Sequence, residues 1–217
     1  MGRLFHPESP LMRFLSNLAD LIALNLIWLI CCVPVITIGA STTAMYCVAR
    51  DIDKGEYPPV LRTFFREFRS NFKQSLLVFL VLLIPMLLVG AYLLMVVSGG
   101  LDHIPLIKYL CYVAIVIIGF ACSYAYPLLA CFDNTVGNTL KNAILLPLAN
   151  PFLALVVTAL NMLPILVLLI NPELLARCLI FWLVIGSALT ALVNIKMLGS
   201  IFRRFVPPGG TFGMRGN

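Results

Sequence analysis

A charge-free stretch at residues 74–98 constrains the fold of this chain more than any other feature. Its 25 residues include no Asp, Glu, Lys or Arg, and similar stretches cover residues 21–49, 109–132, 142–172 and 178–195. Repeated apolar runs of about 20 residues match the ~30 Å hydrocarbon core of a bilayer. The sequence therefore predicts an integral membrane protein of the all-α class, built as a polytopic bundle of transmembrane helices.

Composition favours one membrane domain and argues against nucleic-acid binding. Of the 217 residues, 61% are hydrophobic and 11% are charged, whereas a soluble domain is about 25% charged. We expect a single transmembrane helical domain over residues 1–205 and a flexible cytoplasmic tail over residues 206–217. The net charge of +6 fits basic residues that set membrane topology and meet lipid headgroups, so nucleic acid is not an expected partner.

Four membrane crossings are straightforward, and they are expected at residues 74–98, 106–131, 151–171 and 174–196. The first 50 residues leave two alternatives. One is a single long, kinked helix. The other is a helical hairpin with a helix over residues 11–33, a break from Pro34 to Gly39, and a short helix over residues 40–50.

The distribution of Lys and Arg favours the hairpin. With five crossings, 4 of the 15 basic residues lie on the N-terminal side and 11 on the other. With six crossings both termini are cytoplasmic, only Lys108 and Arg177 lie outside, and 13 lie inside. Cytoplasmic loops are enriched in Lys and Arg. We therefore expect six helices in the cell membrane, the second short or re-entrant, with five as the alternative.

Cytoplasmic amphipathic helices are expected between the crossings. In the first, over residues 60–73, an apolar face opposes a basic face. The apolar face comprises Leu61, Phe64, Phe65, Phe68 and Phe72, and the basic face comprises Arg62, Arg66, Arg69 and Lys73. Such a helix is typical of the membrane interface, and the same face can dock on a partner protein. A second short helix is expected after Asp133-Asn134-Thr135, within the loop at residues 132–151.

Two motifs resemble the YesL-like family of bacterial membrane proteins. The first comprises Leu24-Asn25-Leu26-Ile27-Trp28, the segment at residues 33–40, and Thr43-Ala44-Met45-Tyr46. The second is the aromatic and basic segment at residues 64–75. The similarity extends to about Phe205. Members are uncharacterised, come mostly from Gram-positive bacteria, and are encoded beside genes for sugar uptake and polysaccharide degradation. The resemblance implies an accessory role in carbohydrate import and supplies no catalytic residues.

Polar residues inside predicted spans are candidates for a functional path. Asp20 is the only acid in a span, and Asn17 lies one turn before it on the same helical face. The alternative for Asp20 is a place near the cytoplasmic interface, paired with a basic residue of a neighbouring helix. Asn25, Asn161 and Asn194 are expected either to line a polar pathway or to form interhelical hydrogen bonds.

The break between the first two helices is a second candidate site. A broken helix at membrane depth exposes backbone groups, and its N-terminus favours anionic groups. The alternative is a simple outer turn in which Ser41 or Thr42 caps the following helix. The residues concerned are Pro34, Thr37, Gly39, Ser41, Thr42 and Thr43.

Motifs for catalysis or metal binding do not stand out in the sequence. The seven cysteines lack CxxC spacing, and His6 and His103 have no ligand-type neighbours at suitable spacing. We therefore expect no enzyme activity, no cofactor and no metal. Two functions remain open: an accessory or regulatory subunit of an ABC-type carbohydrate uptake system, or a permease or channel subunit that forms a small-solute pathway as an oligomer. The expected partners are the lipid bilayer and either transporter subunits or further copies of the chain.

Overall fold

The computed structural model describes residues 10–56, 59–98 and 105–205, and every regular element in these ranges is a helix. His6, His103 and the predicted tail at residues 206–217 therefore lie outside the described residues. The elements in chain order are α1 (Pro10–Cys32), the 3-10 turn η1 (Val35–Thr37), α2 (Ile38–Asp53), α3 (Val60–Val97), α4 (Pro105–Cys131), α5 (Val136–Ala149), α6 (Pro151–Ile170), α7 (Pro172–Phe181), the π-helical turn η2 (Trp182–Gly186) and α8 (Ser187–Phe205). This confirms the all-α class.

The predicted hairpin in the first 50 residues is confirmed. α1 ends at Cys32, and η1 turns the chain before α2 begins at Ile38. Pro34 disfavours helical geometry at the residue before it. The Thr37 hydroxyl lies 2.6 Å from the carbonyl oxygens of both Cys31 and Pro34. It therefore ties the turn to the end of α1.

Five of the described helical segments are long and apolar enough to cross a membrane. They are Leu15–Cys32, Val60–Val96, Tyr109–Cys131, Pro151–Leu168 and Ala176–Phe202. This supports a multi-pass membrane protein, and each of the four straightforward spans overlaps one of these segments, with ends that differ by a few residues. α2 is the short second helix of the hairpin. It has 16 residues, about 24 Å of helix, and is not among the five.

α2 forms the centre of the bundle because its neighbours enclose it. Twelve of its residues are buried, and it packs against α1, α3, α4 and α8. Gly39 allows the closest approach, since a Cβ atom there would lie 2.7 Å from the Ser75 carbonyl oxygen and 2.9 Å from Cβ of Phe79. Gly39 is thus a packing residue inside α2, not the turn residue that the sequence suggested.

The amphipathic helix expected over residues 60–73 is not a separate element. It forms the first half of α3, which continues without a break for 38 residues. The physical reason is one buried stripe with helical spacing that runs through both halves. The stripe comprises Val60, Phe64, Glu67, Asn71, Ser75, Val78 and Leu82. The chain therefore has no reason to bend at residue 73.

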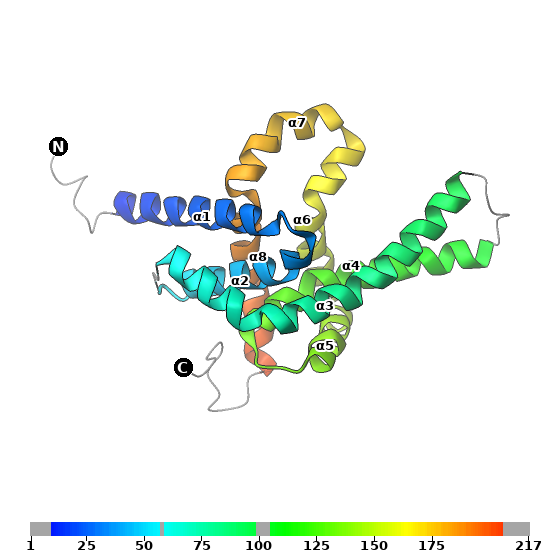
Figure 1. The fold of residues 1–217 in the computed structure, drawn as a ribbon, viewed down its shortest axis with the longest axis horizontal. Helices are drawn as coiled ribbons and strands as arrows, with labels where there is room; N and C mark the ends of the chain where they lie inside the picture. Colours follow the sequence, from blue (N-terminus) through cyan, green and yellow to red (C-terminus); the bar gives the residue numbers. More distant parts are fainter. Residues whose placement is uncertain (1–9, 57–58, 99–104, 206–217) are drawn as a thin grey trace.

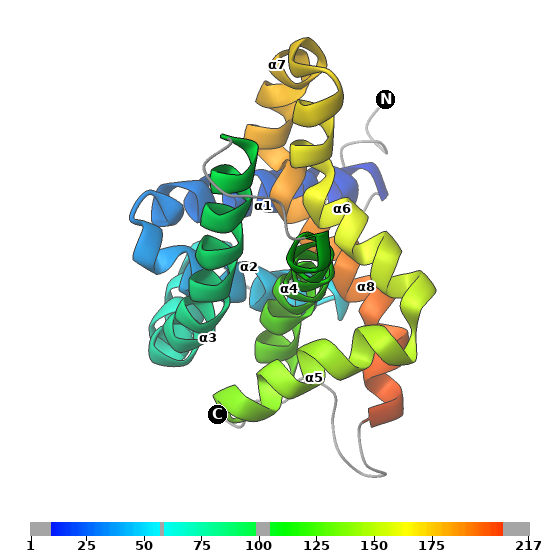
Figure 2. The same cartoon turned by 90° about the vertical axis from the view of Figure 1, so that its right-hand side faces the viewer.

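The second expected short helix is present as α5. Its N-cap is Thr135, whose side chain accepts a hydrogen bond from the Asn138 backbone N–H at 3.4 Å. Figure 2 shows α5 running across the lower end of the molecule, at a steep angle to α4 and α8. In Figure 1 the paired ends of α3 and α4 extend to the right, while α6 and α7 rise at the top. These two arms diverge from the central helices.

Candidate functional site

An aromatic cavity lies between the central helices and the α6–α7 arm. Its volume is about 360 Å³. Its aromatic lining residues are Trp28 of α1, Tyr46 of α2, Tyr126 of α4 and Trp182 of η2. Its polar lining residues are Thr42, Ser123, Asn161, Ser187 and Thr190, and Cys122, Ile38, Met45, Met162 and Pro164 complete the wall. Five helical elements and η2 thus meet around one uncharged space.

A hydrogen-bonded network joins the cavity wall to the buried interior. The Asn194 side-chain amide donates to the Tyr46 hydroxyl at 3.0 Å and to the side-chain oxygen Oδ1 of Asn161 at 2.8 Å. Asn194 is fully buried, whereas Tyr46 and Asn161 reach the cavity. Two candidate asparagines of the sequence are therefore brought together. Sequence reasoning missed Tyr46, because an aromatic residue in an apolar stretch gives no sign of which helix it faces.

Asn25 serves a different role, at the π-helical turn. A π-helical turn breaks the usual helical hydrogen-bonding pattern. The Asn25 amide donates to the Leu183 carbonyl oxygen at 2.7 Å, and its own oxygen accepts from the Ala188 N–H at 2.8 Å. Asn25 is fully buried. The structure thus places it as a link between α1 and the backbone around η2, not in the cavity wall.

Asp20 and Asn17 lie apart from this polar interior. Both are half-buried on α1, and neither belongs to the lining of the aromatic cavity. The structure therefore does not connect Asp20, the only acid of the spans predicted from sequence, to Asn161 or Asn194.

The candidate residues of the helix break are mostly used in packing. Thr42 accepts a hydrogen bond from the Trp28 indole N–H at 3.3 Å and lines the cavity. Thr43 accepts from the Ser75 hydroxyl at 2.9 Å, which joins α2 to α3. Ser41 is buried inside α2, and Pro34 is exposed in the turn. The N-cap of α2 is Thr37, without a side-chain cap, so the expected capping by Ser41 or Thr42 is wrong.

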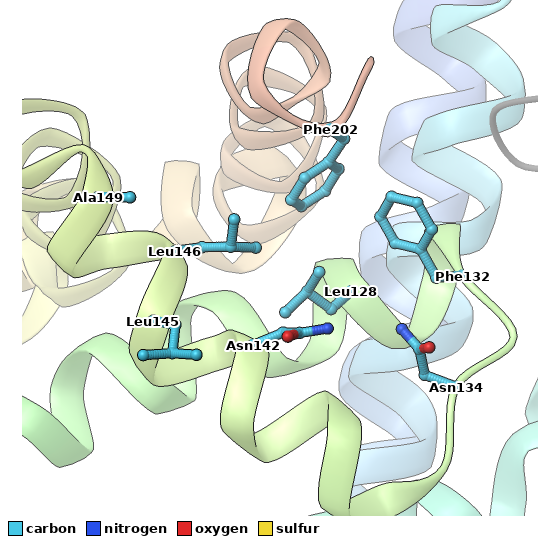
Figure 3. Close-up of a pocket in the computed structure, with 8 residues that line it drawn as sticks. All are labelled: Leu128, Phe132, Asn134, Asn142, Leu145, Leu146, Ala149 and Phe202. Atoms are coloured by element: carbon cyan, nitrogen blue, oxygen red, sulfur yellow. The ribbon is translucent and has the colours of Figure 1, made fainter. Parts of the chain in front are cut away.

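A second cavity, the Phe132 groove, lies where α4, α5 and α8 meet. It measures about 400 Å³ and is lined by Leu128, Phe132, Asn134, Asn142, Leu145, Leu146, Ala149 and Phe202. The Phe132 and Phe202 rings meet edge to face at 5.4 Å. In Figure 3 the amides of Asn134 and Asn142 point into the groove beside these rings. The groove offers an apolar surface with two neutral hydrogen-bonding groups.

The first half of α3 carries a row of exposed cations, here called the basic edge. It comprises Arg62, Arg66, Arg69 and Lys73, with the exposed Phe65 between them. Arg66 pairs with Glu67 at 3.1 Å. The Gln74 amide donates to the Asn134 carbonyl oxygen. The basic edge therefore ends next to the Phe132 groove.

The predicted apolar face of this segment is mostly turned inward. Phe64 is fully buried and stacks on Phe68 with ring centroids 6.2 Å apart, and Phe68 contacts Phe72. Phe65 is 43% exposed and Leu61 is also exposed. These two side chains and the basic edge form the surface that another molecule can reach.

The buried ion pair Arg50–Asp51 was not expected inside the fold. Both residues lie in the last turns of α2, with an N–O contact at 2.8 Å. Arg50 also donates to the Ala130 carbonyl oxygen at the end of α4, where a cation satisfies helix carbonyl groups. Because this contact joins residues 80 positions apart, no local pattern could have revealed it.

The arrangement offers hydrogen bonds and aromatic surfaces more than acid–base groups. None of the described residues that line the aromatic cavity is charged. Among the described residues, no three His, Cys, Asp or Glu side chains gather to form a metal site. The lining of the aromatic cavity therefore suits the recognition of a neutral molecule.

Residues 21–95 match the family described as a protein of unknown function, DUF624. The match begins in α1, includes all of α2 and ends near the end of α3. It thus contains Asn25, Gly39, the Arg50–Asp51 pair and the basic edge. Comparisons with curated proteins and with solved structures found no match.

Proposed function

We propose that this chain is an accessory or regulatory membrane protein of an ABC-type carbohydrate uptake system. In this proposal it resides in the cell membrane with both termini in the cytoplasm, and it binds transporter subunits through the basic edge. The two segments that resemble the YesL-like family fall inside the matched residues 21–95. That resemblance supports the link to carbohydrate import.

The observation that carries the proposal is the charge of the exposed surface of α3. Four cations and one exposed aromatic ring lie on one helix face, and Arg66 also pairs with Glu67 of the buried stripe. Aromatic residues and arginine are enriched where proteins bind one another, and a row of like charges suits an acidic partner surface. The neighbouring Phe132 groove extends this surface with apolar contacts.

A charge reversal tests this proposal. The variant Arg62→Glu, Arg66→Glu, Arg69→Glu is expected to lose the transporter subunits that co-purify with the tagged wild type from native membranes in mild detergent. The matched control replaces the same three residues by Lys, keeps the charge, and is expected to retain most of the partner. The side chains of Arg62, Arg66 and Arg69 are exposed, so both variants should fold.

Two results would contradict this proposal. Wild-type protein that brings down no transporter subunit removes the accessory role. Equal recovery of the partner by the Glu variant shows that the basic edge is not the binding surface. If only a second, differently tagged copy is recovered, the partner is the chain itself.

The aromatic cavity favours a second candidate, a permease or channel subunit. It is lined by residues from α1, α2, α4, α6, η2 and α8, which meet around a space of about 360 Å³. Uptake of a neutral solute by proteoliposomes that contain only this chain would support the second candidate over the first.

A further inference from the structure

We infer that the aromatic cavity is a binding site for a small, uncharged molecule that carries several hydroxyl groups, of about monosaccharide size. This cavity shares no lining residue with the basic edge. Ligand binding there therefore stands or falls independently of the proposed partner.

The size of the cavity limits the ligand. Ligand sites in proteins range from about 300 to 1,000 Å³, so a space of about 360 Å³ suits a single small ring and not an extended chain. The cavity opens between helices that belong to both diverging arms, since α4 supplies Ser123 and Tyr126 and α6 supplies Asn161.

The lining also limits the charge of the ligand. Its side chains are aromatic, aliphatic, hydroxyl, thiol or amide groups, and no Asp, Glu, Lys, Arg or His is among them. An ion that entered would lose hydration without gaining a counter-charge, so its binding would be strongly disfavoured. A neutral ligand avoids this penalty.

Ser123 places an unpaired hydroxyl behind the cavity wall. The residue lines the cavity and is 3% exposed, and its hydroxyl oxygen is covered and has no hydrogen-bond partner among the described residues. Buried polar groups are rarely left without a partner. A ligand hydroxyl would supply one after a small movement of the side chains that cover this oxygen.

The aromatic rings suit the other surface of such a molecule. Two Trp and two Tyr side chains line the space, and their rings can cover the C–H faces of a polyol ring while hydroxyl and amide groups bond its edges. The cavity therefore combines aromatic faces with neutral hydrogen-bonding groups. An acyl chain could contact the rings, but it would leave the hydrogen-bonding groups of the lining without partners.

The chain offers an unusually direct readout for binding. It contains two tryptophans, and both, Trp28 and Trp182, line the cavity. Tryptophan fluorescence of the full-length protein in nanodiscs therefore reports on this site. The probes are D-glucose and myo-inositol, with glucuronate as an anionic and glucosamine as a cationic counterpart, and radiolabelled glucose gives a second measurement.

We expect a saturable fluorescence change with a neutral probe, matched by bound radiolabel, and binding of the charged counterparts weaker by at least about tenfold. Ser123→Ala should weaken binding of the neutral probe about 2- to 10-fold, the effect of one hydrogen bond, without lowering thermal stability. Tyr126→Phe is a second lining variant, and Ser200→Ala, on an exposed part of α8, is the control that should bind normally.

Three results would overturn the inference. They are the absence of saturable binding for both neutral probes, equal binding of the charged counterparts, and unchanged affinity in both lining variants. A fluorescence change that follows only the lipid composition of the nanodisc would assign the cavity to an acyl chain and also overturn it.

Discussion

Asn25 links α1 to η2 and to the start of α8 through two backbone groups, the Leu183 carbonyl and the Ala188 N–H. Asn25→Ala would leave the Leu183 carbonyl and the Ala188 N–H buried without that partner. Hydrogen bonds between membrane helices contribute about 0.6 kcal/mol on average, but stranded buried groups cost about 1–3 kcal/mol. We expect the larger loss, because two backbone groups lose their partner together.

This loss of stability is measured by unfolding the purified protein in mild detergent, either by heating or with denaturant. Asn138→Ala is the matched control, because Asn138 is exposed on α5 and its change should stay within about 0.5 kcal/mol. Equal stability of the two variants would show that Asn25 does not secure the π-helical turn.

At the scale of elements, the contact between α2 and α3 depends on Gly39. In Gly39→Ala the new methyl group would meet the Ser75 backbone oxygen at 2.7 Å, and a backbone atom cannot rotate away. Overpacking of this kind costs about 1–3 kcal/mol. We expect a lower melting temperature and weaker protection of α2 amides in hydrogen exchange.

Gly90→Ala is the control for this change. Gly90 lies inside α3, and nothing lies within 4 Å of its added Cβ. Because Ala favours helix over Gly by about 1 kcal/mol, this variant should be as stable as the wild type or more stable. If the Gly39→Ala and Gly90→Ala proteins melt at the same temperature, the close packing of α2 on α3 is disproved.

The segment at residues 60–73 shows how a local pattern can mislead. Its Phe and Arg residues predicted a free amphipathic helix, in which replacing Phe64 or Phe68 would change only the surface. In the fold Phe64 is fully buried, so its replacement by Ser would damage the core. An exposed face and a protein-covered face have the same apolar periodicity, and only the position of α2 distinguishes them.

At the scale of the whole molecule, the testable property is topology. We expect both termini in the cytoplasm, because 13 of the 15 Lys and Arg residues then lie inside. Reporter fusions ahead of residue 1 and after residue 217 should both give cytoplasmic signals. Opposite locations would mean that α2 does not return the chain across the membrane, which leaves five crossings.

The apolar spans and the hairpin break were determined by the sequence alone. Charge-free runs must avoid water along their whole length, and Pro34 disfavours helical geometry at the residue before it. The N-cap at Thr135 is similarly local. These properties depend on residues adjacent in sequence and on the solvent, so the tertiary arrangement of distant segments does not alter them.

The tertiary structure alone decided which polar residues meet. Asn194 and Asn161 share a hydrogen bond, while Asn25 joins a different element and Asp20 stays apart. The aromatic cavity likewise exists because residues from six elements converge. Helix periodicity gives the direction of each side chain relative to its own axis, but the rotation and crossing of helices are set by packing between segments distant in sequence.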